Sequence, residues 1–491
     1  MDLSKVVNEL RQNYKSGVMQ GIESRLHQLQ RLNDLLDENE ELILEALYKD
    51  LHKCKLESNV MELLQVRKEI GHCFQNLDEW MSPTKVSPDL LNVLNHCEIR
   101  AEPKGVVLII SPWNYPVNLL LSPLAGALAA GNVVVLKPSE VAPNVCRVFE
   151  SLIPRYLDEK CVQLVSGGVL ETTALLKLRF DHIFFTGAPS IAKIVMRAAS
   201  EHLTPVTLEL GGKCPAIIDE TCDFDTISKR IVWGKFCNSG QTCLAVDYIL
   251  CIKKCQDALV NSLKKAIVKF YGEDPKESKS YGRIINERHF ERVCNLINSS
   301  KVIYGGNFDK STLYISPTIL TNVTADDSIM SEEIFGPLLP ILCIEKIDEA
   351  IDFVNSREKP LALYVFSTNP SVVEKILKQT SSGGVCVNDA LVHGAVPNLP
   401  FGGIGQSGMG AYHGKESFDV FSHKKSCLLK NQKFEFMNDI RYPPYDENWF
   451  VIRWVQSLLR PSLKRRFRFN LFHVSLLALI VTCVLKALAM F

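Results

Sequence analysis

The sequence lacks the cysteine spacing of a metal or redox site, although 16 of its 491 residues are cysteine. No two cysteines are separated by two residues, the spacing found in zinc ribbons and thioredoxin-like sites. Cys251 and Cys255 are four positions apart, but no second pair of cysteines or histidines accompanies them at a ligand spacing. We therefore predict no metal site, and we expect most of the thiols to be reduced, buried and inert.

The first nine residues carry no apolar signal core, and the sequence has no net charge. Residues 1–9 are polar, so we expect the body of the chain to stay out of oxidising compartments. The 55 Lys and Arg residues balance 55 Asp and Glu residues, so we predict no nucleic-acid partner. With 46% hydrophobic and 22% charged residues, the composition excludes disordered and fibrous proteins.

One long hydrophobic run is present, LFHVSLLALIVTCVLKALAMF at residues 471–491. A helix of this length spans about 30 Å, which matches the hydrocarbon core of a bilayer. A basic cluster precedes the run, as is typical of the cytoplasmic side of a membrane span: Lys464, Arg465, Arg466 and Arg468. We predict a C-terminal transmembrane helix over 470–491. The alternative is a buried core helix, which would normally carry a polar stripe.

This tail predicts where the protein resides. A span at the end of a chain is inserted after translation, so we expect a tail anchor in a lipid bilayer with the preceding domains in the cytosol. The endoplasmic reticulum is the expected membrane, with the peroxisomal and outer mitochondrial membranes as alternatives. Residues 441–469 form an amphipathic and basic juxtamembrane segment that we expect to lie on the membrane surface or to cover the mouth of an active site.

The body of the chain has the pattern of an α/β protein. Residues 1–80 carry helical periodicity, and short apolar runs then alternate with helical stretches. Strand, helix and strand at this spacing predict right-handed βαβ units and a parallel sheet. The expected strands cover Val106 to Ile110, Val133 to Leu136, Val162 to Val165, His182 to Thr186, Val206 to Leu210, Ala216 to Ile218, Tyr248 to Cys251, Leu338 to Ile344 and Gly384 to Asn388.

A glycine-rich segment near residues 394–410 imitates a dinucleotide fingerprint. Gly403, Gly405 and Gly408 match G-x-G-x-x-G. That motif belongs after the first strand of a βαβ unit, where it opens a helix. This copy is late in the chain and has no such unit around it, so we interpret the segment as a loop.

Four polar residues combine into a catalytic pattern. Cys243 follows a turn rich in glycine and hydroxyl groups, where backbone N–H groups can point at a thiolate or an oxyanion. Glu209 and Asn114 each stand at or just beyond the end of an expected strand, and Glu333 lies beside a tight turn. The segments SPWNYP, LELGGK, FCNSGQTC and EEIFGP that hold them resemble the signature set of the aldehyde dehydrogenase superfamily, in the family's order.

The resemblance covers residues 1–440 and is strongest to the class 3 branch, in particular to membrane-anchored fatty aldehyde dehydrogenases. It implies a Rossmann-like cofactor-binding domain, an α/β catalytic domain and a small oligomerisation arm. The implied boundaries are 1–209 for the NAD-binding domain, with an oligomerisation strand near 80–100, and 210–395 for the catalytic domain. Residues 396–440 would then form the glycine-rich loop and the oligomerisation arm, with a homodimer as the expected assembly.

The same resemblance implies a mechanism. Cys243 would attack the aldehyde, with its pKa lowered by its surroundings because the thiolate is the reactive form. The Asn114 amide and the backbone N–H of Cys243 would stabilise the oxyanion. Hydride departure would leave a thioester, which a carboxylate-activated water hydrolyses. Glu209 is the usual family assignment for this base and Glu333 is a competitor, and the sequence does not separate them.

The resemblance also implies a cofactor site. Lys137 and Glu140 would reach the adenosine ribose, and a carboxylate there favours NAD, although NADP is also accepted by class 3 relatives. Thr186 and Gly187 would lie beside the pyrophosphate at a helix N-terminus. Ala188 and Ala192 depart from the family pattern here, where Ser and Gly are common. The remaining implied cofactor contacts are Trp113, Leu210, Gly211, Glu333 and Phe335.

The function predicted from these observations is oxidation of medium- to long-chain aldehydes to acids. Two alternatives stay open. A cysteine-dependent esterase or thioesterase would use Cys243 without a redox cofactor, but no histidine stands in a recognisable partner motif. A catalytically silent membrane scaffold of the same fold would have no need of Cys243, Glu209, Asn114 and Glu333.

Overall fold

A computed structural model describes residues 2–89, 92, 95–433, 435, 438, 441–444 and 453. The predicted membrane helix over 470–491 lies outside these residues, as does most of the juxtamembrane segment over 441–469. In the described part of the chain, no helix is both long enough and apolar enough to cross a membrane. The chain divides into two compact units, of which the first contains residues 1–83 and 100–425.

The helical start of the chain is confirmed. The longer helices turn an apolar stripe inward; Leu29, Leu32 and Leu36 of the second helix are completely buried. A five-residue π-helical turn, η1, interrupts the series. The elements are α1 (Leu3–Lys15), α2 (Ile22–Glu38), α3 (Glu40–Leu51), α4 (Lys55–Ser58), η1 (Asn59–Leu63) and α5 (Leu64–Met81).

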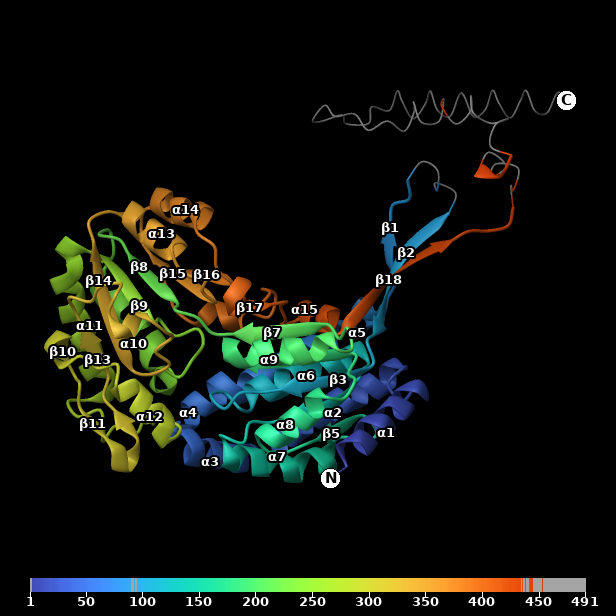
Figure 1. The fold of residues 1–491 in the computed structure, drawn as a ribbon, viewed down its shortest axis with the longest axis horizontal. Helices are drawn as coiled ribbons and strands as arrows, with labels where there is room; N and C mark the ends of the chain where they lie inside the picture. The colour runs from blue at the N-terminus through green and yellow to red at the C-terminus, as the bar shows by residue number, and fades with distance from the viewer. Residues whose placement is uncertain are drawn as a thin grey trace. The chain divides into compact units, whose positions relative to one another are not determined.

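The first large sheet has six strands in the order β17-β7-β6-β3-β4-β5. Figure 1 labels β17, β7, β3 and β5 of this sheet. Its strands are β3 (Val106–Ile110), β4 (Val133–Lys137), β5 (Val162–Leu164), β6 (His182–Gly187), β7 (Val206–Leu210) and β17 (Gly408–Met409). The connecting helices are α6 (Asn118–Ala130), α7 (Pro143–Tyr156), α8 (Val169–Leu176) and α9 (Pro189–Ser200). All pairs from β7 to β5 are parallel. The chain order reverses between β3 and β6, and the carboxyl ends of strands at such a point form a ligand crevice.

The second large sheet has seven strands in the order β10-β13-β14-β9-β8-β15-β16. Its strands are β8 (Pro215–Ile218), β9 (Tyr248–Ile252), β10 (Val302–Tyr304), β13 (Thr318–Leu320), β14 (Leu338–Ile344), β15 (Ala362–Phe366) and β16 (Gly384–Val387). The helices of this part are α10 (Phe224–Phe236), α11 (Gln256–Tyr271), α12 (Glu287–Cys294), α13 (Ile347–Asn355) and α14 (Pro370–Gln379). A two-stranded ladder, β11 (Phe308–Asp309) with β12 (Tyr314–Ile315), accompanies them. The pairs from β13 to β16 are parallel, whereas the edge strand β10 is antiparallel to β13. The predicted α/β fold is confirmed.

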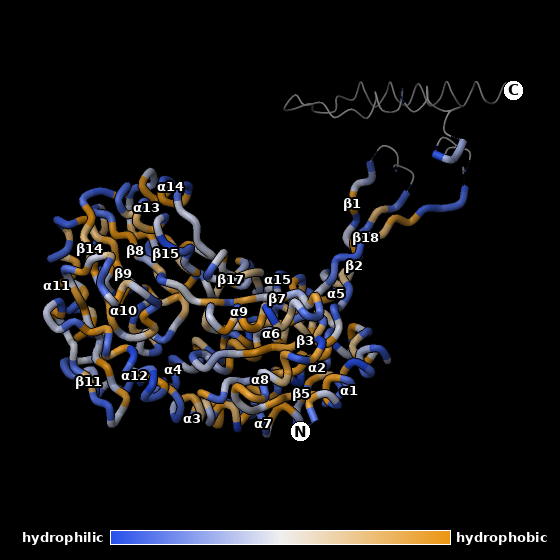
Figure 2. The backbone as a smooth tube through the Cα atoms, viewed as in Figure 1, coloured by the Kyte–Doolittle hydropathy of each residue, from blue (hydrophilic) through white to orange (hydrophobic). Residues whose placement is uncertain are grey.

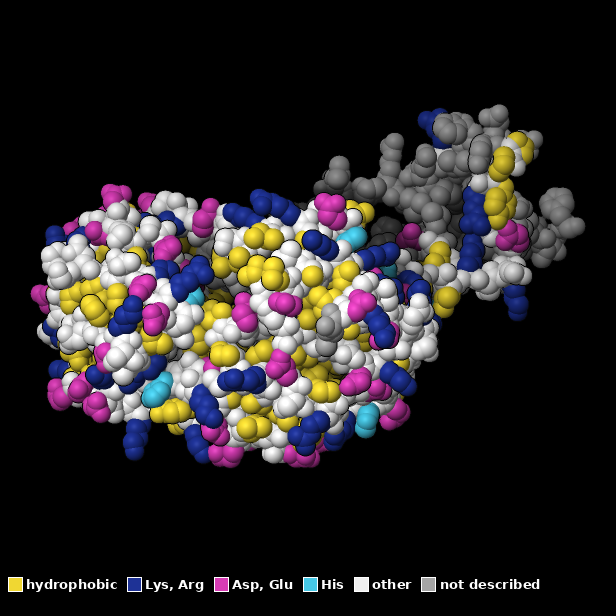
Figure 3. All heavy atoms as spheres, turned by 60° about the horizontal axis from the view of Figure 1, so that its bottom comes forward, with side chains coloured by type: hydrophobic (Ala, Val, Ile, Leu, Met, Phe, Trp, Pro, Cys, Tyr) yellow, Lys and Arg dark blue, Asp and Glu magenta, His cyan; other side chains and the backbone are white. Residues whose placement is uncertain are grey.

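The central strands are buried along their whole length, which is why they stand out in the sequence as continuous apolar runs. Every residue of β3, β4, β9 and β15 is buried, as expected for strands covered on both faces. Figure 2 shows these runs as hydrophobic, whereas the helices alternate between hydrophobic and hydrophilic residues. On the face drawn in Figure 3, Lys and Arg side chains are interspersed with Asp and Glu.

The glycine-rich segment is not only a loop, which corrects our interpretation. Gly408 and Met409 form β17, which pairs antiparallel with β7 so that Gly408 lies opposite Glu209. A side chain at Gly408 would collide with the Leu208 carbonyl oxygen, since a Cβ would lie 2.4 Å from it. Close backbone approach therefore explains this glycine. Gly405–Ser407 is a short 3-10 turn and opens no α-helix, in agreement with the rejected dinucleotide fingerprint.

The second unit contains residues 84–99 and the described residues from 426 onward. Its ladder is a three-stranded sheet in the order β1-β2-β18, in which β1 and β2 are antiparallel. The bounds are β1 (Thr84–Val86), β2 (His96–Pro103) and β18 (Ser422–Leu429), and α15 (Lys415–Val420) precedes β18. These strands occupy the segments for which we predicted an oligomerisation arm.

Two helical glycines give a matched test of the packing. Gly126 in α6 faces Ser417, and a Cβ at Gly126 would lie 2.6 Å from the Ser417 Cβ, whereas a Cβ at Gly71 in α5 would meet nothing within 4 Å. We expect Gly126→Ala to lower the free energy of unfolding by about 1 to 3 kcal/mol through overpacking. Gly71→Ala should raise it by up to about 1 kcal/mol through helix propensity. Thermal unfolding midpoints measure both, and equal midpoints for the two variants would contradict the packing of α6 on α15.

Candidate active site

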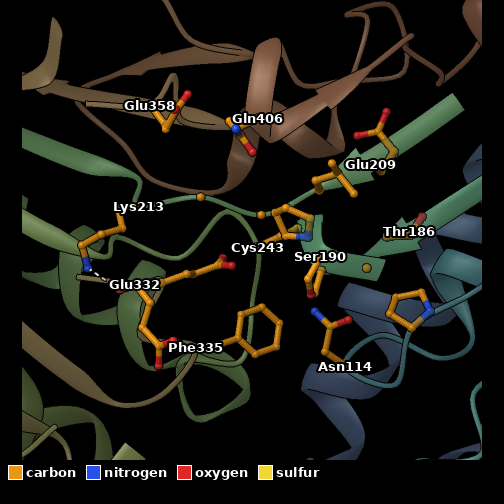
Figure 4. Close-up of a pocket in the computed structure, with 18 of the residues that line it drawn as sticks. Asn114, Thr186, Ser190, Glu209, Lys213, Cys243, Glu332, Phe335, Glu358 and Gln406 are labelled. Atoms are coloured by element: carbon orange, nitrogen blue, oxygen red, sulfur yellow. Dashed lines mark hydrogen bonds between the residues drawn. The ribbon is translucent and has the colours of Figure 1, made fainter. Parts of the chain in front are cut away.

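A cavity of about 920 Å³ opens beside the carboxyl ends of β3, β6 and β7 and reaches the loops of the second sheet (Figure 4). Ten of the twelve predicted site residues line it: Trp113, Asn114, Thr186, Gly187, Glu209, Leu210, Gly211, Cys243, Glu333 and Phe335. Lys137 and Glu140 do not line this cavity. They lie at and just beyond the end of β4, where the Lys137 Nζ is 3.5 Å from a Glu140 carboxylate oxygen.

Cys243 is presented by a turn that begins where α10 ends. Asn238 and Ser239 adopt left-handed backbone angles (φ 50° and 52°), a strained arrangement for residues other than glycine. The Gln241 side chain holds the turn, because its Nε2 donates to the Asn238 carbonyl oxygen (3.0 Å) and its Oε1 accepts from the Ile285 N–H (3.0 Å). The thiol therefore rests on a rigid base rather than on a mobile loop.

The expected lowering of the Cys243 pKa is wrong for this structure. Burial, and after it the negative charges of Glu333 and Glu209, raise the pKa of the thiol to about 12. Backbone N–H groups of Cys243 and Leu244 oppose this shift but do not overcome it. Burial, supported by two carboxyl groups from distant segments, thus keeps the thiol protonated at neutral pH.

Asn114 lies in the segment that connects β3 to α6. Its side-chain Nδ2 donates to the carbonyl oxygen of Gln241 (3.0 Å), two residues before Cys243. The next residue repeats the connection, because the Tyr115 hydroxyl bonds to the Thr242 hydroxyl (2.7 Å). Figure 4 shows the Asn114 amide pointing into the cavity that Cys243 also lines.

Glu209 is the last but one residue of β7 and is only 3% exposed. Neither of its carboxylate oxygens has a hydrogen-bond partner among the described residues. Burial raises the pKa of this carboxyl well above its usual value. An ionisable group kept in this state costs stability, which points to a functional reason for it.

Glu333, unlike Glu209, has a hydrogen-bond donor and charged groups around its carboxylate. Its carboxylate lies directly on Gly211, where a Cβ would come within 2.1 Å of Oε2, and it accepts a hydrogen bond from the Gly212 N–H. The pKa of Glu333 is raised to about 8, because the effects of burial and of the negative charge of Asp247 outweigh the lowering by Gly212, Lys213 and Arg292. The missing side chain of Gly211 thus allows this carboxylate to lie against the backbone.

The cofactor side of the cavity fits a dinucleotide. The Thr186 hydroxyl is buried and has no hydrogen-bond partner in the described part of the protein, at the edge where α9 begins. A twelve-residue helix presents its N-terminal N–H groups there, which suits a phosphate. Trp113 and Phe335 pack edge to face across the cavity, with ring centroids 5.3 Å apart, and offer an apolar wall to a ring.

Comparison with known proteins identifies the family. The aldehyde dehydrogenase family model matches residues 2–427. A mouse protein, "Aldehyde dehydrogenase, dimeric NADP-preferring", is 51% identical over 443 residues, which cover 90% of this chain and 98% of the relative. The chain belongs to the aldehyde dehydrogenase family.

Two further likenesses extend this result. "Aldehyde dehydrogenase family 3 member A2" from Pongo abelii is 47% identical over 483 residues, 98% of this chain and 99% of the relative. A solved structure, described as the substrate-bound state of Staphylococcus aureus AldH, matches with a TM-score of 0.90 and 43% identity. It covers 93% of this chain and 99% of its own. As an aldehyde dehydrogenase, the protein is an oxidoreductase that acts on aldehydes with NAD or NADP.

Several site residues of this aldehyde dehydrogenase escaped the sequence analysis. Lys213 pairs with the buried Asp247 (2.5 Å), whose other oxygen accepts from the Ile334 N–H (3.0 Å) beside Glu333. Arg292 donates to the carbonyl oxygens of Glu333 (3.3 Å) and Ile334 (2.7 Å). Of these residues, only Lys213 could have been noticed in the sequence, because it directly follows the two glycines of LELGGK. Asp247 and Arg292 stand in segments without a motif.

The structure also locates the histidines and cysteines of the aldehyde dehydrogenase. His182 is buried and bonds to the Thr207 hydroxyl (2.9 Å) and to Lys104 (3.1 Å). Across the described ranges, no group of three or more His, Cys, Asp or Glu residues is arranged to hold a metal ion. The cysteines of those same ranges are all free thiols.

The raised thiol pKa predicts how Cys243 reacts with an alkylating agent. Because Cys243 titrates at about 12, its alkylation by iodoacetamide should accelerate about tenfold per pH unit between about pH 6 and pH 10. Glu333 is charged above its own pKa of about 8, where it raises the thiol pKa. Glu333→Gln should therefore speed alkylation above pH 8 and change it little below pH 7. Mass spectrometry of the Cys243 peptide measures the rates.

The exposed neighbour Glu332 supplies the control for this test. Its side chain is 55% exposed, so Glu332→Gln should leave the alkylation profile unchanged. A rate that does not vary between about pH 6 and pH 9 would reveal a thiolate at neutral pH and contradict the raised pKa.

Proposed function

We propose that this aldehyde dehydrogenase oxidises medium- to long-chain aliphatic aldehydes to carboxylic acids through a thiohemiacetal and a thioester on Cys243. The observation that carries this proposal is the convergence of Cys243, Asn114, Glu209 and Glu333 on one cavity at the carboxyl ends of the parallel strands. A nucleophile, an oxyanion donor and two candidate bases are the groups that acyl chemistry on a cysteine requires.

The first step is attack of the Cys243 sulfur on the aldehyde carbonyl. The thiol proton passes to a carboxylate, since the thiol itself titrates far above neutral pH. The negative charge that develops on the substrate oxygen is stabilised by the Asn114 amide and by the backbone N–H of Cys243. A donor of this kind contributes about 3 to 4 kcal/mol to transition-state stabilisation.

The second step forms the thioester and the third hydrolyses it. The nicotinamide cofactor supplies the hydride acceptor when it is bound. Glu333 is the deacylation base in this proposal, for two reasons. It affects the Cys243 pKa more strongly than Glu209 does, and its own pKa of about 8 suits proton exchange at neutral pH. Glu209 remains the alternative base.

The cofactor proposal is NAD, with NADP also accepted. Support for NAD comes from Glu140, whose carboxylate lies half exposed at the end of β4 and would repel a 2′-phosphate. Support for NADP comes from the mouse relative, whose name gives it as NADP-preferring. Lys137 beside Glu140 carries the positive charge that a 2′-phosphate would need.

We propose a homodimer that is anchored to a membrane. The mouse relative is named as dimeric, and the edge strands β1 and β18 of the three-stranded sheet are suited to pairing with a second copy. The apolar run at 471–491 supports anchoring by the C-terminus, with the endoplasmic reticulum as the proposed membrane. Anchoring would place the cavity where aldehydes of lipid origin partition.

Single-turnover kinetics with hexadecanal test the mechanism. We expect Glu333→Gln to form about one reduced cofactor per active site in a rapid burst, and then to turn over about 100- to 10,000-fold more slowly than the wild type, because hydrolysis of the thioester fails. Glu209→Gln should keep its steady rate within about tenfold. Cys243→Ala should form no reduced cofactor.

The other outcomes of this experiment are equally informative. A burst without turnover in Glu209→Gln, with normal turnover in Glu333→Gln, would assign the base to Glu209. Acid production without reduction of the cofactor would favour a cysteine hydrolase. No turnover of any aldehyde by the wild type would support the silent scaffold.

Charges inserted in the tail test the anchoring. Leu479→Arg with Val481→Arg should release the protein from phosphatidylcholine vesicles, because each arginine at the centre of a span costs about 2.5 to 3.5 kcal/mol. Oxidation of hexadecanal dissolved in the vesicles should fall, while oxidation of propanal should not change. Leu479→Ile with Val481→Leu is the matched control. Unchanged sedimentation with vesicles in the arginine variant would refute the anchor.

A further inference from the structure

A buried ion pair lies behind the active site, outside the residues that line its cavity. Lys53 follows the end of α3, and Glu62 lies in the π-helical turn η1. Their side chains have no exposed surface, and the Lys53 Nζ is 2.7 Å from Glu62 Oε1. Neither residue belongs to a motif that the sequence analysis singled out, and the chemistry proposed for Cys243 does not use either.

This pair holds the backbone of the segment that carries Asn114. Lys53 Nζ donates to the Asn114 carbonyl oxygen (2.8 Å) and lies 3.9 Å from the centre of the Tyr115 ring. Glu62 Oε2 accepts from the backbone N–H groups of Val117 (3.1 Å) and Asn118 (3.0 Å). Three backbone groups between residues 114 and 118 are therefore fixed by one pair of charges.

The other side of the same segment is fixed to the turn that carries the nucleophile. The Asn238 Nδ2 donates to the Asn114 carbonyl oxygen (2.9 Å), which thus accepts from Asn238 and from Lys53 together. The Asn114 amide donates to the Gln241 carbonyl oxygen (3.0 Å). A shift of the Asn114 backbone would accordingly move its side-chain amide relative to Cys243.

The local backbone explains how Glu62 reaches this position. A π-helical turn inserts one extra residue per turn, which rotates the side chains that follow and often marks a functional site. In η1 this turn places Glu62 and Leu63 in the interior, while Val60 remains exposed. The carboxylate arrives at the N-terminus of α6, where two N–H groups have no partner within the helix.

The free-energy cost of burying the Lys53–Glu62 pair indicates that the pair does more than stabilise the fold. Burial raises the pKa of Glu62, and Lys53 together with the two N–H groups lowers it. Desolvation of two charges offsets most of their attraction, so apolar residues of similar volume usually stabilise a core as well or better. A buried pair whose remaining bonds all end on the Asn114 segment is suited to placing that segment.

We propose that Lys53 and Glu62 are positioning residues that set the Asn114 amide in line with the oxyanion formed on attack by Cys243. The inference rests on the oxyanion role proposed for Asn114. Its consequence is that loss of the pair reduces the rate of the step in which the oxyanion develops, and does so only through Asn114.

A double-mutant cycle tests this coupling. The measured quantity is the single-turnover rate of cofactor reduction with hexadecanal, per active site counted from the burst amplitude, in the full-length enzyme with NAD. Lys53→Met should lower the rate about 10- to 100-fold in the wild-type background, because small displacements of a catalytic group have effects of this size. In the Asn114→Ala background the same substitution should change the rate less than about twofold.

A second variant controls for the case in which Lys53→Met unfolds the protein by leaving the Glu62 charge buried without a partner. Lys53→Met with Glu62→Gln removes both charges while the glutamine can still accept from Val117 and Asn118, so no unpaired charge remains buried. It should show the same dependence on Asn114.

The matched control is Arg25→Met. Arg25 is a buried cation, 5% exposed, which donates to the carbonyl oxygens of Met19 (3.0 Å) and Ala129 (3.0 Å), the latter at the opposite end of α6. This substitution should lower stability but keep the rate per active site within about twofold of the wild type.

The possible outcomes distinguish a failure of the positioning role of Lys53 and Glu62 from a failure of the oxyanion role proposed for Asn114. An equal fold-loss from Lys53→Met in both backgrounds, or a wild-type rate in the wild-type background, would overturn the positioning role while leaving Asn114 as the oxyanion donor. If Asn114→Ala alone has no effect, the oxyanion role fails, and the positioning role fails with it.

Discussion

The hydrogen bond from the Asn114 amide to the Gln241 carbonyl oxygen connects the loops of the two large sheets that carry Asn114 and Cys243. Asn114 comes from the loop after β3 of the first sheet, and Gln241 from the turn that precedes β9 of the second. The Asn114 amide and the Cys243 thiol are therefore placed by different halves of the chain. Their separation depends on this contact and on the neighbouring bond between Tyr115 and Thr242. Whatever fixes the loop after β3 also fixes the reaction geometry.

Desolvation sets the protonation states in the cavity. Cys243, Glu209 and Glu333 all have raised pKa values, with burial as the largest cause in each case. In such surroundings the neutral form of an acid is favoured, so proton transfer between neighbours costs less than ionisation of any one of them. The site thus holds three acids whose neutral forms are favoured, rather than a thiolate stabilised by a cation.

The sequence allowed much of the fold and most of the site to be predicted, because buried parallel strands are continuous apolar runs and ligand groups follow their ends. β3 and β7 led directly to Asn114 and Glu209. β17 escaped, because a glycine-rich run carries no strand signal and its partner Glu209 is 199 positions away. The Cys243 pKa and the Lys53–Glu62 pair escaped for a similar reason. Each depends on which distant side chains become neighbours after folding, and a lone Lys or Glu in a helical stretch resembles a solvated surface residue.

The unpartnered carboxyl of Glu209 has a consequence for the history of the protein. A buried polar group without a partner reduces the stability of the fold, so selection for heat resistance alone would replace it with an apolar residue of the same size. If Glu209 is kept because it serves as the alternative base, stability and turnover pull this position in opposite directions. A lineage that no longer needed that base would then lose Glu209 early and gain stability, whereas a lineage that needed it would keep the fold below its attainable stability.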